Sequence, residues 1–415
     1  MGVIGKRAFE LLSKISFERL GGSPEELHSL KFIKKELDLL DIENEIEPFE
    51  VDYYNIKKAE CIVTEPNLTS YEVTGYGMSG SIDIEKEFVY LESSKYIKLM
   101  NLEDKIVLIN GGMAYTIYED LVKAKIAGFI TTSGSIYDDL NNTDLEQRQL
   151  RERHYKNGKI IGVTMRIKDA EKLVLSNPKK IRIIVEQEEG KRQSHNLIAT
   201  IPGTKSNEVI CFTAHYDSVK FSTGAYDNGT GSVTIMELLR YYKENPPKRT
   251  LKFIWCGSEE MGLLGAHAYV NNHAEELENY LLCLNVDMTG VPLGKDIAVC
   301  TSEMSLVQYI DYFAKINGYV CEASQGVYSS DSTPFANKNV PAVSFARISP
   351  RGGAEIHSRK DVLDLIQPDY LEKTILFIAN LSNQLINSEY FPVPKSMPQN
   401  MKDELDKYLG VKKNG

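Results

Sequence analysis

Hydrophobic residues recur at helical spacing near the start of the chain. Ser23, Pro24 and Glu26 are the residue types of an N-cap, a first-turn proline and an acid at the third helical position. The apolar residues that follow lie three or four positions apart: Leu27, Leu30, Ile33, Leu37 and Leu40. This pattern predicts an amphipathic helix over residues 23–40. The next segment, IENEIEPFEVDYY, is expected to be extended.

From about residue 50 to 189 the pattern changes to short apolar runs that are typical of strands. These runs are AECIVTE, EFVYLE, KIVLING, GFITTSG, KIIGVTM and IRIIVEQ. Helical stretches are short and are expected near 117–126 and 167–175. Because nothing in this part groups histidines with carboxylates, we interpret it as a separate β-rich domain inserted into a larger one.

From residue 190 onward, predicted strands alternate with predicted helices. The strands are NLIATI, VICFTA, LKFIWC, LLCLNVD and PAVSFA, and the helices cover 231–243, 260–272, 304–317 and about 368–386. This alternation predicts an α/β fold with a mostly parallel mixed sheet flanked by helices. We therefore expect a catalytic domain made of 1–49 and 190–390, the insertion at 50–189, and a polar C-terminal tail at 391–415.

Composition and charge narrow the classes of partner. The chain has 415 residues, which favours two domains, and a formal net charge of −10, which argues against a nucleic-acid partner. No apolar run approaches the 18 residues of a membrane span, and the first residues lack a signal-peptide pattern. We expect a cytoplasmic protein with no membrane partner. The six cysteines are scattered singly and are expected to be buried, reduced thiols.

Side chains with metal-binding chemistry follow several predicted strands where each strand ends. They are His215 and Asp217 after VICFTA, with Asp227 in the next loop, Glu259 and Glu260 after LKFIWC, Asp287 at the end of LLCLNV, and His357 after PAVSFA. Alone, each is equally consistent with an ordinary hydrogen-bonded histidine or a helix-start acid. Together at the carboxyl edge of one sheet, these carboxylates would need cations.

The types of candidate ligand indicate which cations would bind. Imidazole with carboxylate suits zinc best, with cobalt or manganese as possible substitutes. Five candidate ligands exceed what one catalytic zinc needs while it keeps a water site, so they divide naturally between two metal ions.

The chain resembles the co-catalytic di-zinc aminopeptidases related to the transferrin receptor and glutamate carboxypeptidase. The stretches that carry the resemblance are SHNLIATIPG, TAHYDSV, GAYDNGTGSVTIMELLR, LKFIWCGSEEMGLLGAHAYV, LNVDMTG, SSDSTPFANKNVPAVSF and EIHSRKDVLDLI. They cover about residues 190–390. The resemblance implies a zinc-exopeptidase fold, phosphorylase/hydrolase-like in architecture. It also implies that residues 50–189 are a protease-associated domain.

The resemblance further implies two zinc ions per chain and a role for each ligand. His215 and Asp287 would hold one metal ion, Glu260 and His357 the other, and Asp227 would bridge them. No organic cofactor is expected.

Two further residues are expected to act in catalysis beside the metals. Asp217 would orient the imidazole of His215. Glu259 would be the general base, because a base must still take the proton of the attacking water and pass it to the departing amine.

Two positions depart from the pattern of many relatives. Ile356 stands where a tyrosine often precedes the last histidine, and Ser332 stands where an SDHxPF signature has histidine. The oxyanion donor and the specificity pocket are therefore not assigned by the resemblance.

The expected function is hydrolysis of the N-terminal peptide bond of peptides with a free amino terminus, through hydroxide held by two metals. A carboxypeptidase-type hydrolase is an alternative, because Arg347 and Arg351 near His357 could hold a substrate carboxylate. A glutaminyl cyclase on the same fold and a non-catalytic binding protein are further alternatives. The sequence predicts neither the preferred N-terminal residue nor the oligomeric state.

Overall fold

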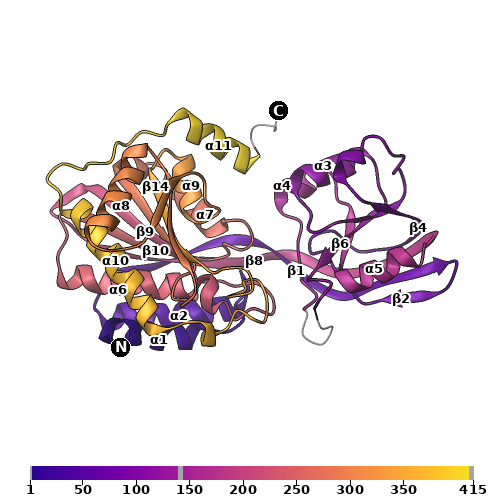
Figure 1. Cartoon of the computed structure of the whole chain (residues 1–415), viewed down its shortest axis with the longest axis horizontal. Helices are drawn as coiled ribbons and strands as arrows, with labels where there is room; N and C mark the ends of the chain where they lie inside the picture. Colours follow the sequence, from indigo (N-terminus) through magenta and orange to yellow (C-terminus); the bar gives the residue numbers. More distant parts are fainter. Residues whose placement is uncertain (1, 139–143, 411–415) are drawn as a thin grey trace. The chain divides into compact units, whose positions relative to one another are not determined.

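The computed structural model describes residues 2–138 and 144–410 (Figure 1). The chain forms two compact units, one made of Met1–Val51 and Gln193–Gly415 and the other of Asp52–Arg192. The chain passes from one unit to the other within β1 (Asn44–Glu65) and within β8 (Lys180–Ile201). These crossings lie close to the domain boundaries expected near residues 49 and 190.

The larger unit is built on a mixed sheet with the strand order β13-β12-β14-β11-β9-β10-β8. The bounds are β8 Lys180–Ile201, β9 Lys205–His215, β10 Arg249–Cys256, β11 Tyr280–Val286, β12 Lys295–Thr301, β13 Glu322–Gln325 and β14 Ala342–Ile348. The four central strands, β14, β11, β9 and β10, are parallel neighbours, whereas β12 pairs antiparallel with β14 and β8 pairs antiparallel with β10. β13 pairs parallel with β12 at the edge. The predicted α/β fold with a mostly parallel mixed sheet is confirmed.

Side chains of β9 alternate between two apolar layers, as the two-residue period of a strand requires. Ile210 and Phe212 belong to the core on one face of the sheet, and Val209 and Cys211 belong to the core on the other. Both faces of this central strand are therefore covered.

Helices provide the two layers (Figure 1). Buried residues of the first layer come from α1 Val3–Ile15, α2 Pro24–Leu39, α6 Thr230–Glu244, α8 Met304–Ile316 and α10 Pro368–Asn387. Those of the second come from α7 Leu264–Asn272, α9 Ser332–Asn337 and α11 Gln399–Leu409. Short helical turns lie at η2 Ala225–Gly229, η3 Glu276–Asn279 and η4 Leu363–Leu365.

The predicted polar tail contains a packed helix. Met401 and Leu405 of α11 are buried in the second layer, because an apolar residue recurs every fourth position on one side of this helix. Residues 411–415 of the expected tail lie outside the described residues.

Two predicted helix starts show where a local sequence signal succeeds and where it fails. The Ser23 side chain accepts a hydrogen bond from the Glu26 amide at 3.1 Å, and α2 begins at Pro24 as expected. The helix predicted from residue 260 is wrong at its start, since α7 begins only at Leu264. Ser258 and Leu263 have φ values of 52° and 61°, which are incompatible with a continuous right-handed helix.

The smaller unit contains its own sheet, in the order β8-β4-β5-β6-β7-β3, with β1 paired to β2. The bounds are β1 Asn44–Glu65, β2 Thr69–Tyr71, β3 Val73–Gly75, β4 Ile82–Leu91, β5 Ile106–Ile109, β6 Gly128–Ser133 and β7 Ile161–Arg166. The helices are η1 Ser94–Tyr96, α3 Tyr115–Lys123, α4 Glu152–Tyr155 and α5 Ile167–Leu175. Two hydrophobic clusters, one including Leu173 of α5 and one including Leu121 of α3, form the core of this unit.

In the part of the chain that the structure describes, no helix combines the length and the apolar character needed to cross a membrane.

Candidate metal centre

The candidate site lies at the carboxyl edge of the parallel strands. His215 is the last residue of β9, Asp287 directly follows β11, and Glu259 and Glu260 lie a few residues after β10. His357 comes from the loop after β14. Because parallel neighbours end at one edge of a sheet, four separate loops deliver these side chains to the same place.

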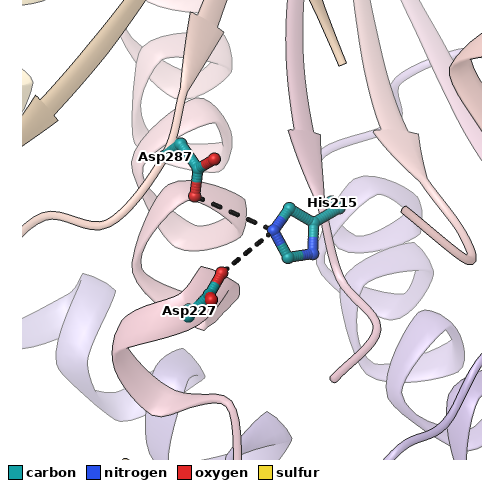
Figure 2. A group of neighbouring side chains, drawn as sticks. All are labelled: His215, Asp227 and Asp287. Atoms are coloured by element: carbon teal, nitrogen blue, oxygen red, sulfur yellow. Dashed lines mark ion pairs between the residues drawn. The ribbon is translucent and has the colours of Figure 1, made fainter. Parts of the chain in front are cut away.

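One group consists of His215, Asp227 and Asp287, whose ligand atoms lie within 4.8 Å of one another. The Nε2 atom of His215 is 3.2 Å from Oδ1 of Asp227 and 3.7 Å from Oδ1 of Asp287 (Figure 2). All three side chains are buried. This spacing fits one ion held between an imidazole and two carboxylates.

A second group consists of Asp227, Glu260 and His357. The Nε2 atom of His357 is 3.2 Å from Oδ2 of Asp227 and 3.0 Å from Oε2 of Glu260. Asp227 thus directs a different oxygen to each histidine, which is the arrangement that a bridging carboxylate requires. The structure therefore contains two candidate metal sites that share one residue.

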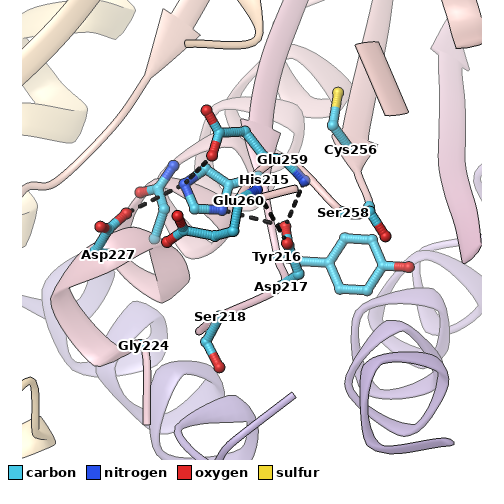
Figure 3. A network of polar contacts seen from close by, with 12 residues as sticks. His215, Tyr216, Asp217, Ser218, Gly224, Asp227, Cys256, Ser258, Glu259 and Glu260 are labelled. Atoms are coloured by element: carbon cyan, nitrogen blue, oxygen red, sulfur yellow. Dashed lines mark hydrogen bonds and ion pairs between the residues drawn. The ribbon is translucent and has the colours of Figure 1, made fainter. Parts of the chain in front are cut away.

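The carboxylate of Asp217 connects three parts of the site. Its Oδ1 lies 3.4 Å from Nδ1 of His215, on the side of the ring away from the metal groups. The same carboxylate accepts hydrogen bonds from the amides of Glu259 at 3.0 Å and Glu260 at 3.2 Å (Figure 3). Asp217 therefore lies against the His215 ring and also holds the turn that carries the Glu-Glu pair.

Glu259 lies beside the two groups but belongs to neither. Its Oε2 is 3.9 Å from Nε2 of His215, beyond hydrogen-bonding distance, and the side chain is 11% exposed. Successive residues of the turn therefore present their carboxylates differently: Glu260 pairs with His357, whereas Glu259 does not make that contact.

Burial and like charge make this cluster unstable without cations. Burial raises the pKa of Glu259 well above its ordinary value and also raises the pKa values of Glu260 and Asp287, with neighbouring carboxylates adding to each shift. The buried Oδ1 of Asp287 has no hydrogen-bond partner among the described residues. Buried carboxylate oxygens normally have partners, so the donor set fits metal ions.

The histidines and the shared aspartate respond to the same field. Burial by itself lowers the pKa of His215, but the surrounding carboxylates raise it well above the usual range, and they raise the pKa of His357 to about 12. For Asp227 burial has the opposite effect and raises the pKa. Its contacts with both histidines outweigh the effect of burial and hold the pKa of Asp227 below its usual value. Strong negative potential is thus concentrated between the two imidazoles.

The loop that carries Asp227 is held from two sides. Asp361 accepts hydrogen bonds from the amides of Tyr226 at 2.7 Å and Asp227 at 3.1 Å. The Asn228 side chain donates to the carbonyl of Val286 at 2.9 Å, at the end of β11. These bonds fix the shared carboxylate relative to the strand that leads to Asp287.

Sequence reasoning missed a buried arginine beneath the site. Arg19 donates hydrogen bonds to the carbonyls of Tyr216, Thr223 and Gly224, the last at 2.7 Å. Burial lowers its pKa to about 10, against the opposing effect of nearby carboxylates. No local sequence pattern indicates this role, because Arg19 lies about 200 positions from these carbonyl partners.

The sequence analysis also missed Asp361. This residue follows His357 closely enough in the sequence to have been considered.

Ser332, which replaces the histidine of the SDHxPF signature, is part of a buried hydroxyl cluster. Its Oγ lies 3.0 Å from that of Ser330 and 2.9 Å from that of Ser344, and the latter two are 2.7 Å apart. Ser332 is therefore engaged in the interior of the protein. The side chain of Ile356, by contrast, is partly exposed next to His357.

Comparisons with known proteins agree with this geometry. Residues 196–382 match the model of Peptidase family M28. Aminopeptidase YwaD of Bacillus subtilis (strain 168) is 29% identical over 217 residues, 48% of this chain and 45% of that protein. Carboxypeptidase Q of Xenopus laevis is 26% identical over 324 residues, 71% of this chain and 68% of that protein. The chain thus spans just under half the length of the first of these relatives and about two thirds of the second.

Solved structures share the fold over nearly the whole chain. An aminopeptidase from Aneurinibacillus sp. strain AM-1 has a TM-score of 0.76 at 21% identity, covering 94% of this chain and 96% of that one. BSAP, a zinc aminopeptidase from Bacillus subtilis, has a TM-score of 0.76 at 21% identity and covers 95% and 97%. The family match does not extend to the smaller unit, so its protease-associated character stays a prediction. Residues 196–382, which include the strand-end histidines and carboxylates, are thus the part of this chain that is similar to Peptidase family M28.

Proposed function

We propose that this protein is a metal-dependent aminopeptidase that hydrolyses the N-terminal peptide bond of peptides with a free amino terminus. The observation that carries the proposal is the pair of ligand groups that share Asp227, with the carboxylate of Glu259 standing beside them. The M28 match of residues 196–382 supports the same reaction class.

In the proposed enzyme, two zinc ions occupy the two groups, with cobalt or manganese as possible substitutes. His215 and Asp287 would hold one ion, Glu260 and His357 the other, and Asp227 would contact both. When bound, such ions would polarise the scissile carbonyl and lower the pKa of the attacking water.

Glu259 is the proposed proton carrier. Its carboxylate would accept a proton from the attacking water and donate it to the nitrogen of the departing amine, so that the peptide C–N bond breaks without releasing an amide anion. Burial raises the pKa of this group, which makes its protonated form accessible in the second step. Asp217 would keep both the His215 ring and the Glu259 amide in place during the cycle.

The charge of the site favours a substrate with a free ammonium group. Four carboxylates, those of Asp227, Glu259, Glu260 and Asp287, converge there with two imidazoles. Two divalent cations and the guanidinium of Arg19 would together offset this charge only in part if the second-layer acids Asp217 and Asp361 are included. A protonated substrate amine complements the remainder and would orient the first peptide bond.

The contacts of Arg347 weaken the carboxypeptidase alternative. This side chain is buried and donates to the carbonyls of Val291 at 2.6 Å and Pro292 at 2.8 Å, and to Asp296 at 2.9 Å. Its guanidinium is therefore committed within the fold and is not available for a substrate carboxylate. Arg351 is exposed and retains that possibility, and a relative carries the name carboxypeptidase Q.

A single comparison separates the alternatives. Metal content of the purified protein is measured together with hydrolysis of a peptide that has a free amino terminus, its N-acetylated form and its C-terminally amidated form. We expect two metal ions per chain, loss of turnover on acetylation and little effect of amidation. Turnover that survives acetylation but is lost on amidation would show that the protein is a carboxypeptidase. Release of ammonia from a peptide with an N-terminal glutamine would show that it is a glutaminyl cyclase.

A further inference from the structure

The carboxylate of Glu26 is buried behind the turn that carries the Glu-Glu pair. Glu26 is 1% exposed although it lies in the first turn of α2, where an acid is normally solvated. It accepts hydrogen bonds from the Gly22 amide at 2.8 Å, the Ser194 hydroxyl at 2.9 Å and the Ser258 amide at 2.9 Å. One carboxylate thus joins the start of α2, a residue of β8 and the turn after β10.

Ser258 is the residue directly before Glu259, and its backbone is in the left-handed region at φ 52°. Its hydroxyl also lies 3.2 Å from Glu26. The next two amides of the turn, those of Glu259 and Glu260, are bound by Asp217. Three successive amides are therefore held by two buried carboxylates, and the residue with the left-handed backbone is the one that Glu26 holds.

Helix capping alone does not account for these contacts. A capping acid satisfies amides of its own helix terminus, and Ser23 already performs that task at α2. Glu26 instead distributes its acceptor capacity over three chain segments. Burial raises its pKa to about 8, so its position carries a cost that an exposed acid would avoid.

We propose that Glu26 is a positioning residue for catalysis, which holds the Ser258 amide and so sets the direction in which the Glu259 side chain leaves the turn. This inference rests on the proposed function, since it assigns Glu259 the proton transfer. Within the described residues, the hydrogen bonds of Glu26 go to Gly22, Ser194 and Ser258, and none of these is a candidate metal ligand. The effect of Glu26 on metal binding should therefore be small.

The test is Glu26→Gln, with Glu25→Gln as a matched control on the same helix turn. The Gly22 amide donates to Oε2 and the Ser258 amide to Oε1, so a glutamine must turn its NH2 group toward one of these two donors. We expect kcat to fall by about tenfold, because small displacements of a catalytic group are costly. KM and metal content should stay within about twofold. Glu25 is exposed, and its substitution should leave all three unchanged.

A double-mutant cycle with Glu259→Gln identifies the route of the effect. If Glu26 acts through Glu259, then adding Glu26→Gln to Glu259→Gln should lower the residual kcat by less than about twofold. A full tenfold loss in that background would overturn the proposal, as would a fall in metal content that parallels the fall in kcat.

The measurements also separate this inference from the proposed function. An inactive wild type, or a Glu259→Gln variant with normal turnover, would overturn both. Normal kcat in Glu26→Gln, when Glu259→Gln has lost activity, would overturn the role of Glu26 alone. If Glu26→Gln does not fold, Ser194→Ala tests the role of Glu26 instead, because it removes one donor to the Glu26 carboxylate. This variant should lower kcat by about threefold when Glu259 is present, and should have no such effect in the Glu259→Gln background. Unchanged kcat in Ser194→Ala would then overturn the role of Glu26.

Discussion

At the scale of single residues, two chemically identical side chains in the site make different contacts. Glu259 and Glu260 are adjacent and both side chains are 11% exposed, yet only the carboxylate of Glu260 lies within 3.0 Å of His357. The carboxylate of Glu259 remains 3.9 Å from the nearest imidazole. The difference arises from the turn, whose two amides are both bound to Asp217 and therefore cannot exchange orientations.

Replacing each of these glutamates by glutamine should cause different failures. Glu259→Gln keeps the size of the side chain but cannot accept a proton, so kcat should fall by roughly 10²–10⁴ with unchanged metal content. Glu260→Gln replaces an anionic ligand by a neutral amide and should lower occupancy toward one ion per chain. Metal analysis alongside steady-state kinetics distinguishes the two. Loss of metal in Glu259→Gln with two ions retained in Glu260→Gln would reverse the assigned roles.

At the scale of elements, the N-terminal segment before α2 supports the loops that carry the ligands. Arg19 binds carbonyls on both sides of the loop between β9 and η2, at Tyr216 and at Gly224. Its own amide donates to the Ser218 hydroxyl at 3.0 Å. The spacing between His215 and Asp227 therefore depends on a residue from a distant part of the chain.

Arg19→Lys should destabilise the larger unit although it keeps the charge. An ammonium group lacks the planar fork that reaches four carbonyls, those of Phe17, Tyr216, Thr223 and Gly224, so buried acceptors would lose their donors. We expect the free energy of unfolding to fall by about 2–4 kcal/mol, measured by urea denaturation. Arg7→Lys is the matched control, because the Arg7 side chain is 39% exposed and bonds to a single carboxylate, that of Glu237. An equal loss in both variants would contradict the role given to Arg19.

The elements that could be predicted from the sequence are those with strong local signals. Helices expected over 23–40 and about 368–386 are observed at Pro24–Leu39 and Pro368–Asn387, since each has a first-turn proline and a regular apolar stripe. The strand ends that carry His215 and Asp287 were equally clear. The start of α7 was misplaced because the left-handed backbone at Leu263 depends on tertiary contacts, although Gly262 beside it was a usable warning.

Of the candidate site, only the polar residues that lie at or near strand ends could be predicted from the sequence. The metal-ligand residues follow apolar runs, and the structure brings all five together. Glu26 was interpreted as a helix cap, and its contact with Ser258, 232 positions away, has no local signature. The ionic environment was therefore predictable, whereas the second layer of residues that holds it was not.

At the scale of the whole molecule, the chain contains two units with separate hydrophobic cores. Among the described residues, both candidate metal groups belong to the larger unit. Effects of metal binding on stability should therefore be confined to that unit.

Calorimetry with and without a chelator tests this expectation. We expect two unfolding transitions, of which only the one belonging to the larger unit moves to lower temperature when metal is removed, because the buried carboxylates then repel one another. Isolated Asp52–Arg192 identifies the other transition if it folds alone. A chelator that shifts both transitions equally would show that the units do not unfold separately.

The smaller unit should lose stability in acid through His154. This residue is buried, its Nδ1 accepts a hydrogen bond from the Arg151 amide at 3.1 Å, and burial lowers its pKa to about 4. Because the unfolded chain protonates this imidazole near pH 6.5, its contribution is complete above that pH and is lost as the pH falls toward 4. Thermal unfolding at several pH values should show a weaker acid dependence for His154→Gln, whose amide does not titrate. Identical slopes would exclude His154 as the cause.

The order in which a ribosome makes this chain has a consequence for Arg19 and Glu26. Both are synthesised early, yet their partners lie in β8 and in the loops after β9 and β10. Until those segments emerge, a cation and an acid that are buried in the finished protein must stay hydrated, so the first helices cannot complete their packing. The smaller unit is contiguous and can fold in the interval. Assembly of this chain is thus expected to begin with the smaller unit, and α1 and α2 should join the sheet of the larger unit only after its central strands have been translated.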